Sequence, residues 1–326
     1  MTTHATVVVQ TGCVNVPWEA AICAENLGSL GEFGLIDALS AWLPAGPRTL
    51  VGIGDDAAVL AAPDGRVVAT TDFLIEGRHF RRDWSAAADV GHKAAARSLA
   101  DIAAMGAHAS GLLIALAGPP DLPVPWLKEF VSGLAAEASR AGAAVIGGDT
   151  SRADLVVLAV TGLGDLAGRA PVLRGGARPG DVLAVAGPLG HAAAGLALLA
   201  SGVRDDPLVA AQLRPAPPYD AGPEAAGLGA TAMIDVSDGL LADVAHIATA
   251  SGVRIDLNTD LITNGGSTPE LTLMLTGGED HSLAATFPPG TELPPRWRVI
   301  GEVVDGRGVT VNGAAYEGQA GWDHFR

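Results

Sequence analysis

The chain has 326 residues, 48% of them hydrophobic and 4% aromatic, so it can bury a substantial core, and its length favours two domains over one. Its net charge of −16 argues against nucleic acid or an anionic membrane as the main partner, and admits anionic substrates only with metal ions between. Cys13 and Cys23 provide neither a disulfide framework nor a CxxC metal site. The apolar stretches are too short to cross a bilayer and the N-terminus lacks a signal-peptide pattern, so we expect a cytoplasmic protein.

Residues 1–30 show no clean periodicity and are expected to form an extension without fixed structure. The organised part is expected to begin at Gly31, with strands and helices alternating from there. The predicted elements of the first half are strands at 67–71, 111–117, 143–146 and 155–163 and helices at 89–105 and 126–141. Asp89 suits the N-cap of the first of these helices, and Gly106 suits its end.

The segment 168–180 is rich in glycine, proline and arginine and is predicted to be the domain boundary. It divides an N-terminal domain, 31–167, from a C-terminal domain, 168–326. The predicted elements beyond it are strands at 181–186, at 232–236 and near Leu283 and Val299, with helices at 189–200 and 239–250.

Five short acidic clusters, each beside glycine or a hydroxyl residue, are spread along the chain. They occupy residues 54–56, 70–72, 147–150, 235–239 and 277–280. Most follow an apolar run, so a fold that brings strand ends together would gather many carboxylates. Carboxylates with threonine and serine oxygens suit Mg²⁺, which keeps some waters and completes its shell with phosphate oxygens. The clusters together therefore favour a site for divalent cations and a phosphorylated substrate.

Each cluster taken alone has a simpler explanation, because aspartate beside glycine is common in turns and helix caps. Asp235 and Ser237 would then cap the helix that starts near Gly239, and Asp101 would pair with Arg97 at the helix surface. Five clusters in one chain are much harder to explain as turns.

The sequence contains no GxxxxGK[ST] loop, no complete GxGxxG and no HExxH or GxSxG motif, so neither a P-loop nor a Rossmann phosphate site is indicated. Lys93 and Lys128 are the only lysines, and anion recognition is therefore expected to fall to arginine, backbone amides or metal. Lys93, Arg97 and Asp101 are spaced four apart, on one face of the predicted helix.

In chain order, the segments GEFGLI, GIGDDAAVL, TTDFLIEGRHF, SLADIAAMGA, GGDTSR, RGGARPGD, IDVSDGL and GGED resemble the thiamine-monophosphate kinase family, which belongs to the aminoimidazole ribonucleotide synthetase superfamily. The resemblance runs from Gly31 to Phe325. It implies a two-domain α/β (α+β) fold like that of aminoimidazole ribonucleotide synthetase, with an N-terminal mixed sheet with helices and a C-terminal α/β sandwich. It also implies an ATP site between the two halves and a homodimer formed through the N-terminal domains.

The resemblance implies roles for particular residues as well. The Mg²⁺ ligands are expected to be Asp56, Thr70, Thr71, Asp72, Asp101, Asp149, Asp235 and Asp238. The expected ATP contacts are Gly148, Asp149, Arg174 and Ser237. The expected thiamine monophosphate contacts are His79, Glu279 and Trp322. Among all of these, the residues expected to be catalytic are Asp149, Arg174 and Asp235.

The activity implied is phosphorylation of thiamine monophosphate to thiamine diphosphate by in-line transfer from ATP, assisted by several Mg²⁺ ions. The acceptor oxygen is already anionic, so no strong general base is required. The sequence departs from the family pattern at His281, where tyrosine is usual, and at Trp322, where tyrosine is common.

Two alternatives are weaker. Another ATP-dependent synthetase of the superfamily is disfavoured because Cys13 and Cys23 have no adjacent lysine and the chain ends in Arg326. A non-catalytic nucleotide-binding protein would be expected to lose its acidic ligands, and every one is present.

Overall fold

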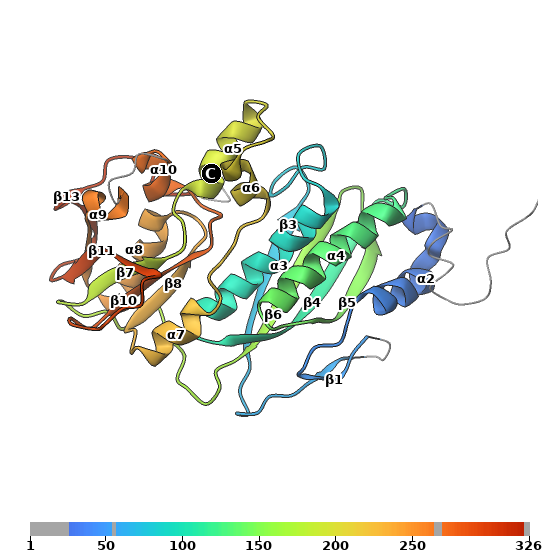
Figure 1. The fold of residues 1–326 in the computed structure, drawn as a ribbon, viewed down its shortest axis with the longest axis horizontal. Coiled ribbons are helices and arrows are strands. Elements are labelled where there is room, and N and C mark those ends of the chain that lie inside the picture. Colours follow the sequence, from blue (N-terminus) through green and yellow to red (C-terminus); the bar gives the residue numbers. More distant parts are fainter. Residues whose placement is uncertain (1–25, 54–56, 264–268, 323–326) are drawn as a thin grey trace, which may run out of the picture.

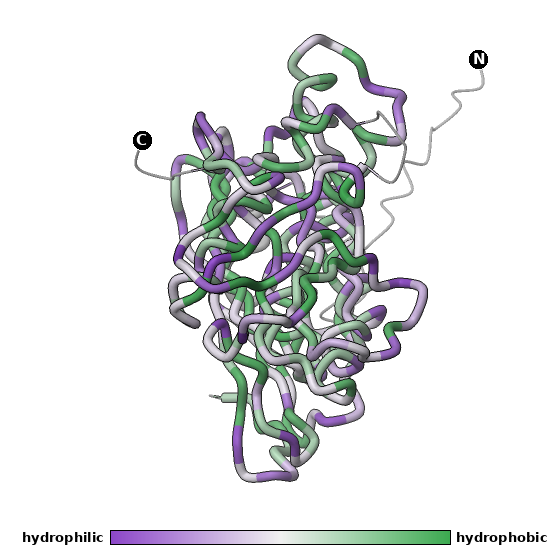
Figure 2. The backbone as a smooth tube through the Cα atoms, turned by 90° about the vertical axis from the view of Figure 1, so that its left-hand side faces the viewer, coloured by the Kyte–Doolittle hydropathy of each residue, from purple (hydrophilic) through white to green (hydrophobic). Residues whose placement is uncertain are grey.

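The computed structural model describes residues 26–53, 57–263 and 269–322. Asp56 and most of the expected N-terminal extension lie outside the described residues. The described chain forms two α/β halves side by side, each built on one principal sheet (Figure 1). Several of its outermost loops are hydrophilic, whereas hydrophobic segments run through the middle (Figure 2). Within these residues no helix is both long and apolar enough to cross a membrane.

The N-terminal half is a four-stranded mixed sheet with helices on one face. Its elements are α2 (Leu27–Trp42), β1 (Thr49–Val51), β2 (Val59–Leu60), β3 (Val68–Ile75), α3 (Ala87–Ala104), β4 (His108–Gly118), α4 (Val124–Arg140), β5 (Val145–Arg152) and β6 (Val157–Asp165). The strand order is β3-β6-β4-β5, with β4 and β5 parallel and the other pairs antiparallel. Strands β1 and β2 form a separate hairpin-like pair.

Helices α3 and α4 lie next to each other across one face of this sheet (Figure 1). They approach closely through two glycines: a Cβ on Gly91 would stand 2.0 Å from the carbonyl oxygen of Phe130, and one on Gly133 would stand 2.0 Å from that of Ala88. No larger residue fits at either place without separating the helices. This close packing fixes the face of α3 that points away from α4.

The C-terminal half is a seven-stranded sheet covered on both faces. Its elements are β7 (Val182–Ala186), α5 (His191–Ala200), α6 (Pro207–Leu213), α7 (Ala221–Gly227), β8 (Ala232–Val236), α8 (Leu240–Ser251), β9 (Arg254–Leu257), α9 (Thr259–Thr263), α10 (Leu271–Thr276), β10 (Ser282–Phe287), β11 (Trp297–Val304), β12 (Gly308–Val311) and β13 (Ala314–Ala315). The order is β13-β12-β9-β11-β7-β10-β8, antiparallel except for β12 with β9.

Helix α3 of the N-terminal half contacts the sheets of both halves. It packs against β3, β4 and β6 of its own sheet and also against β8 and β10 of the other. The apolar core is accordingly continuous across the boundary: Leu99 and Ala103 of α3 lie in the same buried cluster as Met233, Leu283 and Phe287. The N-terminal mixed sheet with helices and the C-terminal α/β sandwich expected from the resemblance are confirmed.

Most predicted elements are present, with shifted ends. The predicted helix 89–105 spans Ala87–Ala104; Asp89 stands inside its first turn and accepts a hydrogen bond from the Ala86 amide at 3.0 Å, and Gly106 ends it with a φ of 73°. Helix α2 begins at Leu27, before the expected start of order at Gly31.

Candidate active site

A cavity of about 1170 Å³ lies between the two halves. The N-terminal half contributes β3, the segment that follows it and α3; the C-terminal half contributes α5, α6, α10 and the segments after β8 and before β10. The chain ends its described part at the same cavity, because Trp322 lines it and its amide donates to the carbonyl of Asp238 at 2.9 Å.

One end of the cavity is acidic. Asp72 of β3 and Asp101 of α3 face Asp235 of β8 and Asp238, which follows that strand. Burial, then the charges of Asp235 and Asp72, raise the pKa of Asp101 to about 7. Thr70 opposes this by donating to Asp101 Oδ2 at 2.6 Å. Carboxylates that raise one another's pKa are a place where a cation binds favourably.

The turn after β8 is held by a carboxylate that the sequence analysis did not single out. Oδ2 of Asp243 accepts hydrogen bonds from the amides of Ser237, Asp238 and Gly239, each at 3.0 Å. Asp243, rather than Asp235 or Ser237, therefore supplies these bonds at the start of α8. Burial and then the charge of Asp235 raise its pKa to about 7.

Asp235 points into the site, where its Oδ2 lies 3.1 Å from Nδ1 of His281. Both side chains are buried. Burial alone would lower the pKa of His281, but the hydrogen bond and charge of Asp235 raise it above its usual value. The residue that replaces the usual tyrosine thus contacts an expected metal ligand.

In the segment 277–281, the side chains of Glu279 and Asp280 point in different directions, and both differ from that of His281. It can lie against the turn after β8 only because Gly278 has no side chain: a Cβ there would stand 2.3 Å from the carbonyl oxygen of Ser237. Glu279, at a φ of 73°, reaches α3. Asp280 turns away and caps α5, accepting from the amides of Gly190 at 2.5 Å and Ala192 at 2.8 Å.

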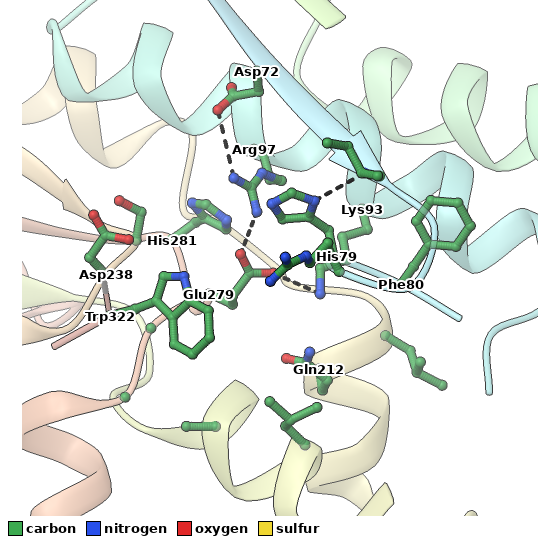
Figure 3. Close-up of a pocket in the computed structure, with 18 of the residues that line it drawn as sticks. Asp72, His79, Phe80, Lys93, Arg97, Gln212, Asp238, Glu279, His281 and Trp322 are labelled. Atoms are coloured by element: carbon green, nitrogen blue, oxygen red, sulfur yellow. Dashed lines mark hydrogen bonds and ion pairs between the residues drawn. The ribbon is translucent and has the colours of Figure 1, made fainter. Parts of the chain in front are cut away.

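Glu279 binds two cations of the other half. Its Oε2 lies 2.7 Å from Lys93 Nζ, and its Oε1 accepts a hydrogen bond from Arg97 (Figure 3). Burial alone would raise the pKa of Glu279, but Lys93 and Arg97 outweigh it and hold the pKa below its usual range. These ion pairs join the two halves inside the cavity.

The other end of the cavity is largely apolar, with the guanidinium of Arg81 4.4 Å from the Trp84 ring centroid. Phe80 and Trp84 from the segment after β3 line it with Leu196 and Leu199 of α5 and Leu213 of α6. In Figure 3, Phe80 and Gln212 lie on one side of Glu279, and Asp238, His281 and Trp322 lie on the other. With a divalent cation at the acidic end, the cavity can hold a ligand with an anionic portion and a large apolar portion.

The cavity gathers most of the expected site residues. It is lined by Thr71, Asp72, His79, Asp101, Asp235, Ser237, Asp238, Glu279 and Trp322, and Thr70 reaches it through its bond to Asp101. His79 accepts a hydrogen bond from the Ile75 amide at its Nδ1, 3.0 Å away. The site is therefore built from both halves.

Gly148, Asp149 and Arg174 are not in the lining of the cavity. Asp149 pairs across the sheet with Ala115, Ala115 with Ala159, and Ala159 with Phe73, so Asp149 shares the face of Phe73. Asp72 points to the opposite face, where Ser98 of α3 donates to it at 2.8 Å. Strand β5 is also at the opposite edge of the sheet from β3, so within one chain Asp149 lies apart from the acidic end.

The acidic end suits a hard divalent cation, because most of its donors are carboxylate and hydroxyl oxygens and the pKa of Asp101 is raised. Within the ranges that the structure describes, no three acidic, histidine or cysteine side chains already lie close enough together to hold a metal ion. Mg²⁺ commonly keeps waters and takes phosphate oxygens as ligands, so this donor set fits an ion that arrives with a nucleotide.

Sequence models of the AIR synthase related protein family match residues 54–166 with the N-terminal domain and residues 178–313 with the C-terminal domain. The thiamine-monophosphate kinase of Mycobacterium tuberculosis is 47% identical over 312 residues, which are 92% of this chain and 93% of that protein. The chain belongs to the thiamine-monophosphate kinase family. The family member of Corynebacterium glutamicum is 38% identical over 92% of this chain and 95% of its own length.

Solved structures of the family share the fold. The thiamine-monophosphate kinase of Stenotrophomonas maltophilia superposes with a TM-score of 0.77 at 34% identity, covering 88% of this chain and 98% of its own. AaThiL complexed with AMPPCP and TMP gives a TM-score of 0.75 at 33% identity, covering 93% of this chain and 99% of that one. The hydrogenase maturation protein HypE in complex with ATP, at 18% identity and a TM-score of 0.65, shares the fold alone.

Proposed function

We propose that the protein transfers the γ-phosphoryl group of ATP to thiamine monophosphate and releases thiamine diphosphate and ADP. The observation that carries the proposal is a cavity with an acidic end, two buried cations in its middle and an apolar end, in a chain 47% identical to a thiamine-monophosphate kinase. Support for two phosphorylated ligands comes from AaThiL, which is known complexed with AMPPCP and TMP.

Mg²⁺ would be held by oxygens of Thr70, Thr71, Asp72, Asp101, Asp235 and Asp238, with Asp56 and Asp149 as further ligands. When bound, the metal neutralises charge on the phosphates. The protein's own contribution is orientation: Asp243 fixes the turn that carries Ser237 and Asp238. Ser98 and Thr70 hold the carboxylates of Asp72 and Asp101.

ATP would contact Gly148, Asp149, Arg174 and Ser237, and thiamine monophosphate would contact His79, Glu279 and Trp322. Trp322 would offer an aromatic face to the cationic thiamine rings. Trp322 is 61% exposed and lines the cavity, so a ring can reach it.

Transfer would be in line. An oxygen of the acceptor phosphate bonds to the γ-phosphorus while the bond from that phosphorus to the β,γ-bridging oxygen breaks, and the electron pair leaves with ADP. Because the acceptor oxygen is anionic at neutral pH, no residue has to remove a proton. Positioning and charge stabilisation are then sufficient for the transfer. No side chain has to gain or lose a proton.

The uncovered face of the N-terminal sheet supports the proposed homodimer. Among the described residues, helices α3 and α4 cover one face of this sheet and no helix covers the other (Figure 1). On the other face Phe73 is 58% exposed among small side chains such as Ala69 and Ala115, which are also exposed. Exposed apolar sheet surface of this kind is typical of an interface. Asp149 lies on the same face, and we propose that a second copy packed there brings it into a complete site.

The test is to incubate the protein with ATP, Mg²⁺ and either thiamine or thiamine monophosphate and to separate the products. We expect thiamine diphosphate from the monophosphate only. Product from thiamine, or none from either acceptor, would overturn the proposal. Asp149→Ala and Asp235→Ala are expected to lose nearly all turnover, and near-normal turnover in both would contradict the metal assignment.

A further inference from the structure

Two buried cations of α3 face the cavity. Lys93 and Arg97 are 3% and 8% exposed, whereas the arginines Arg78 and Arg81, which also line the cavity, are exposed. Lys93 and Arg97 stand one helical turn apart and project to the same side. Both end on the single carboxylate of Glu279.

This pair has more donors than its partner can use. Arg97 Nη2 lies 3.8 Å from Asp72, and its Nε is buried without a hydrogen-bond partner among the residues that the structure describes. Lys93 finds a second acceptor in Gln212, at 3.2 Å, when that amide is turned to satisfy its neighbours. The two cationic side chains have N–H groups that the Glu279 carboxylate does not use. They therefore suit an anion with several oxygens better than one carboxylate.

The pair also lies at the junction of the two ends of the cavity. Arg97 reaches toward Asp72 at the acidic end, and Lys93 reaches toward Gln212 of α6 at the apolar end (Figure 3). A ligand with a cationic ring system and one phosphate has to place that phosphate beside the nucleotide. Mg²⁺ at the acidic end is shared with the phosphates of the nucleotide, so a further counter-charge for the acceptor phosphate is useful at this junction.

We propose that Lys93 and Arg97 form the docking site for the phosphate of the acceptor, and that Glu279 occupies this site until the acceptor displaces it. The proposal rests on the proposed function, since it names the residues that receive the acceptor phosphate. The displaced carboxylate stays in the cavity as a counter-charge for the thiamine cation. Glu279 is the more exposed partner, with 28% of its side chain accessible against 4% for Lys93, so it is the group free to leave.

The experiment compares thiamine monophosphate with thiamine, which lacks the phosphate, by calorimetric titration of the full chain loaded with Mg²⁺ and AMPPCP. Arg97→Gln is expected to weaken thiamine monophosphate binding about tenfold to a hundredfold and thiamine binding less than about threefold. Arg82→Gln is the matched control: it removes the same charge from a pair with Glu76 at 2.6 Å outside the cavity, and is expected to change neither. Equal loss of both ligands, or loss of neither, overturns the phosphate site.

Two further variants keep the test decisive if Arg97→Gln does not fold. Arg97→Lys retains the charge and loses the fork, and should weaken only the phosphorylated ligand, by about threefold to tenfold. Glu279→Gln removes the competitor, so inorganic phosphate, used as the probe with AMPPCP present, should bind about tenfold more tightly. Phosphate binding that is unchanged or weaker overturns the displacement.

Failure of the site and failure of the proposed function give different results. If the wild-type protein forms thiamine diphosphate and Arg97→Gln weakens both ligands equally, the phosphate site is wrong and the proposed function stands. If the wild-type protein forms no thiamine diphosphate but Arg97→Gln selectively weakens the phosphorylated ligand, the anion site stands and the proposed function is wrong.

Discussion

Replacing Glu279 with glutamine should destabilise the unliganded protein strongly. The change keeps the side-chain volume and the backbone at a φ of 73°, and removes only the charge that pairs with Lys93 and Arg97. At 2.7 Å the Lys93 pair alone is worth about 6 kcal/mol of gross attraction at an effective dielectric constant near 20. Removing one partner of a buried pair costs about 3–5 kcal/mol.

The lower end of that range applies, because water reaches 28% of the Glu279 side chain. We therefore expect Glu279→Gln to lose about 3 kcal/mol of unfolding free energy, or roughly 4 °C of melting temperature. Urea unfolding and calorimetry at pH 7.5 without ligand measure the loss. Asp83→Asn, which breaks the exposed pair with Arg81, is the control and should leave the melting temperature unchanged.

A loss below about 1 kcal/mol in Glu279→Gln would show that water in the cavity solvates Lys93 and Arg97, and would refute the reasoning from burial. A double-mutant cycle with Lys93→Met separates the pair from the rest of the site. If the two side chains interact directly, the double variant is more stable than the sum of the single losses predicts.

Without divalent cations, the melting temperature should fall as the pH rises from about 5 to 8. Folding raises the pKa of Asp101 to about 7 and that of Asp280 to about 6. In this range the folded state therefore holds protons that the unfolded chain has already released near pH 4. A flat or rising profile in EDTA contradicts those shifts. Tyr219→Phe should lose about 1–3 kcal/mol, since it leaves the buried Glu137 carboxylate without the Tyr219 hydroxyl, while turnover per folded molecule stays unchanged; urea unfolding and active-site titration check both. Phe73→Asp should leave the protein monomeric in sedimentation, and a dimer as tight as the wild type would exclude the uncovered sheet face as the interface.

The positions of most strands and helices could be predicted from periodicity, and those of 232–236 and 182–186 nearly to the residue. Helix α2 could not, because glycine recurs through it and no apolar face stands out. The strand ends predicted beside two of the acidic clusters differ from those in the structure. The hydroxyl and acidic residues at 70–72 were expected to end a strand, yet β3 continues to Ile75, and residues 148 and 149 lie within β5.

The position of Asp72 and Asp149 inside strands decides which way their side chains point. Side chains alternate along a strand, so a residue inside one can face either side of the sheet, and Asp149 faces away from Asp72. The sequence therefore identified the acidic residues and could not say which of them meet in one chain. In the same way, spacing placed Lys93 and Arg97 on one helix face, but what that face meets depends on tertiary packing that brings Glu279 across from the other half.

Helix α3, packed between the two sheets, has a consequence for the integrity of the chain. Its residues from Ala94 to Ala96 are fully buried, and its partners β8 and β10 belong to the other half. An isolated N-terminal fragment would expose that apolar surface to water, and an isolated C-terminal fragment would expose the opposite surface. The two halves should consequently melt in a single calorimetric transition, and each should be recoverable from cells only when the other is synthesised with it.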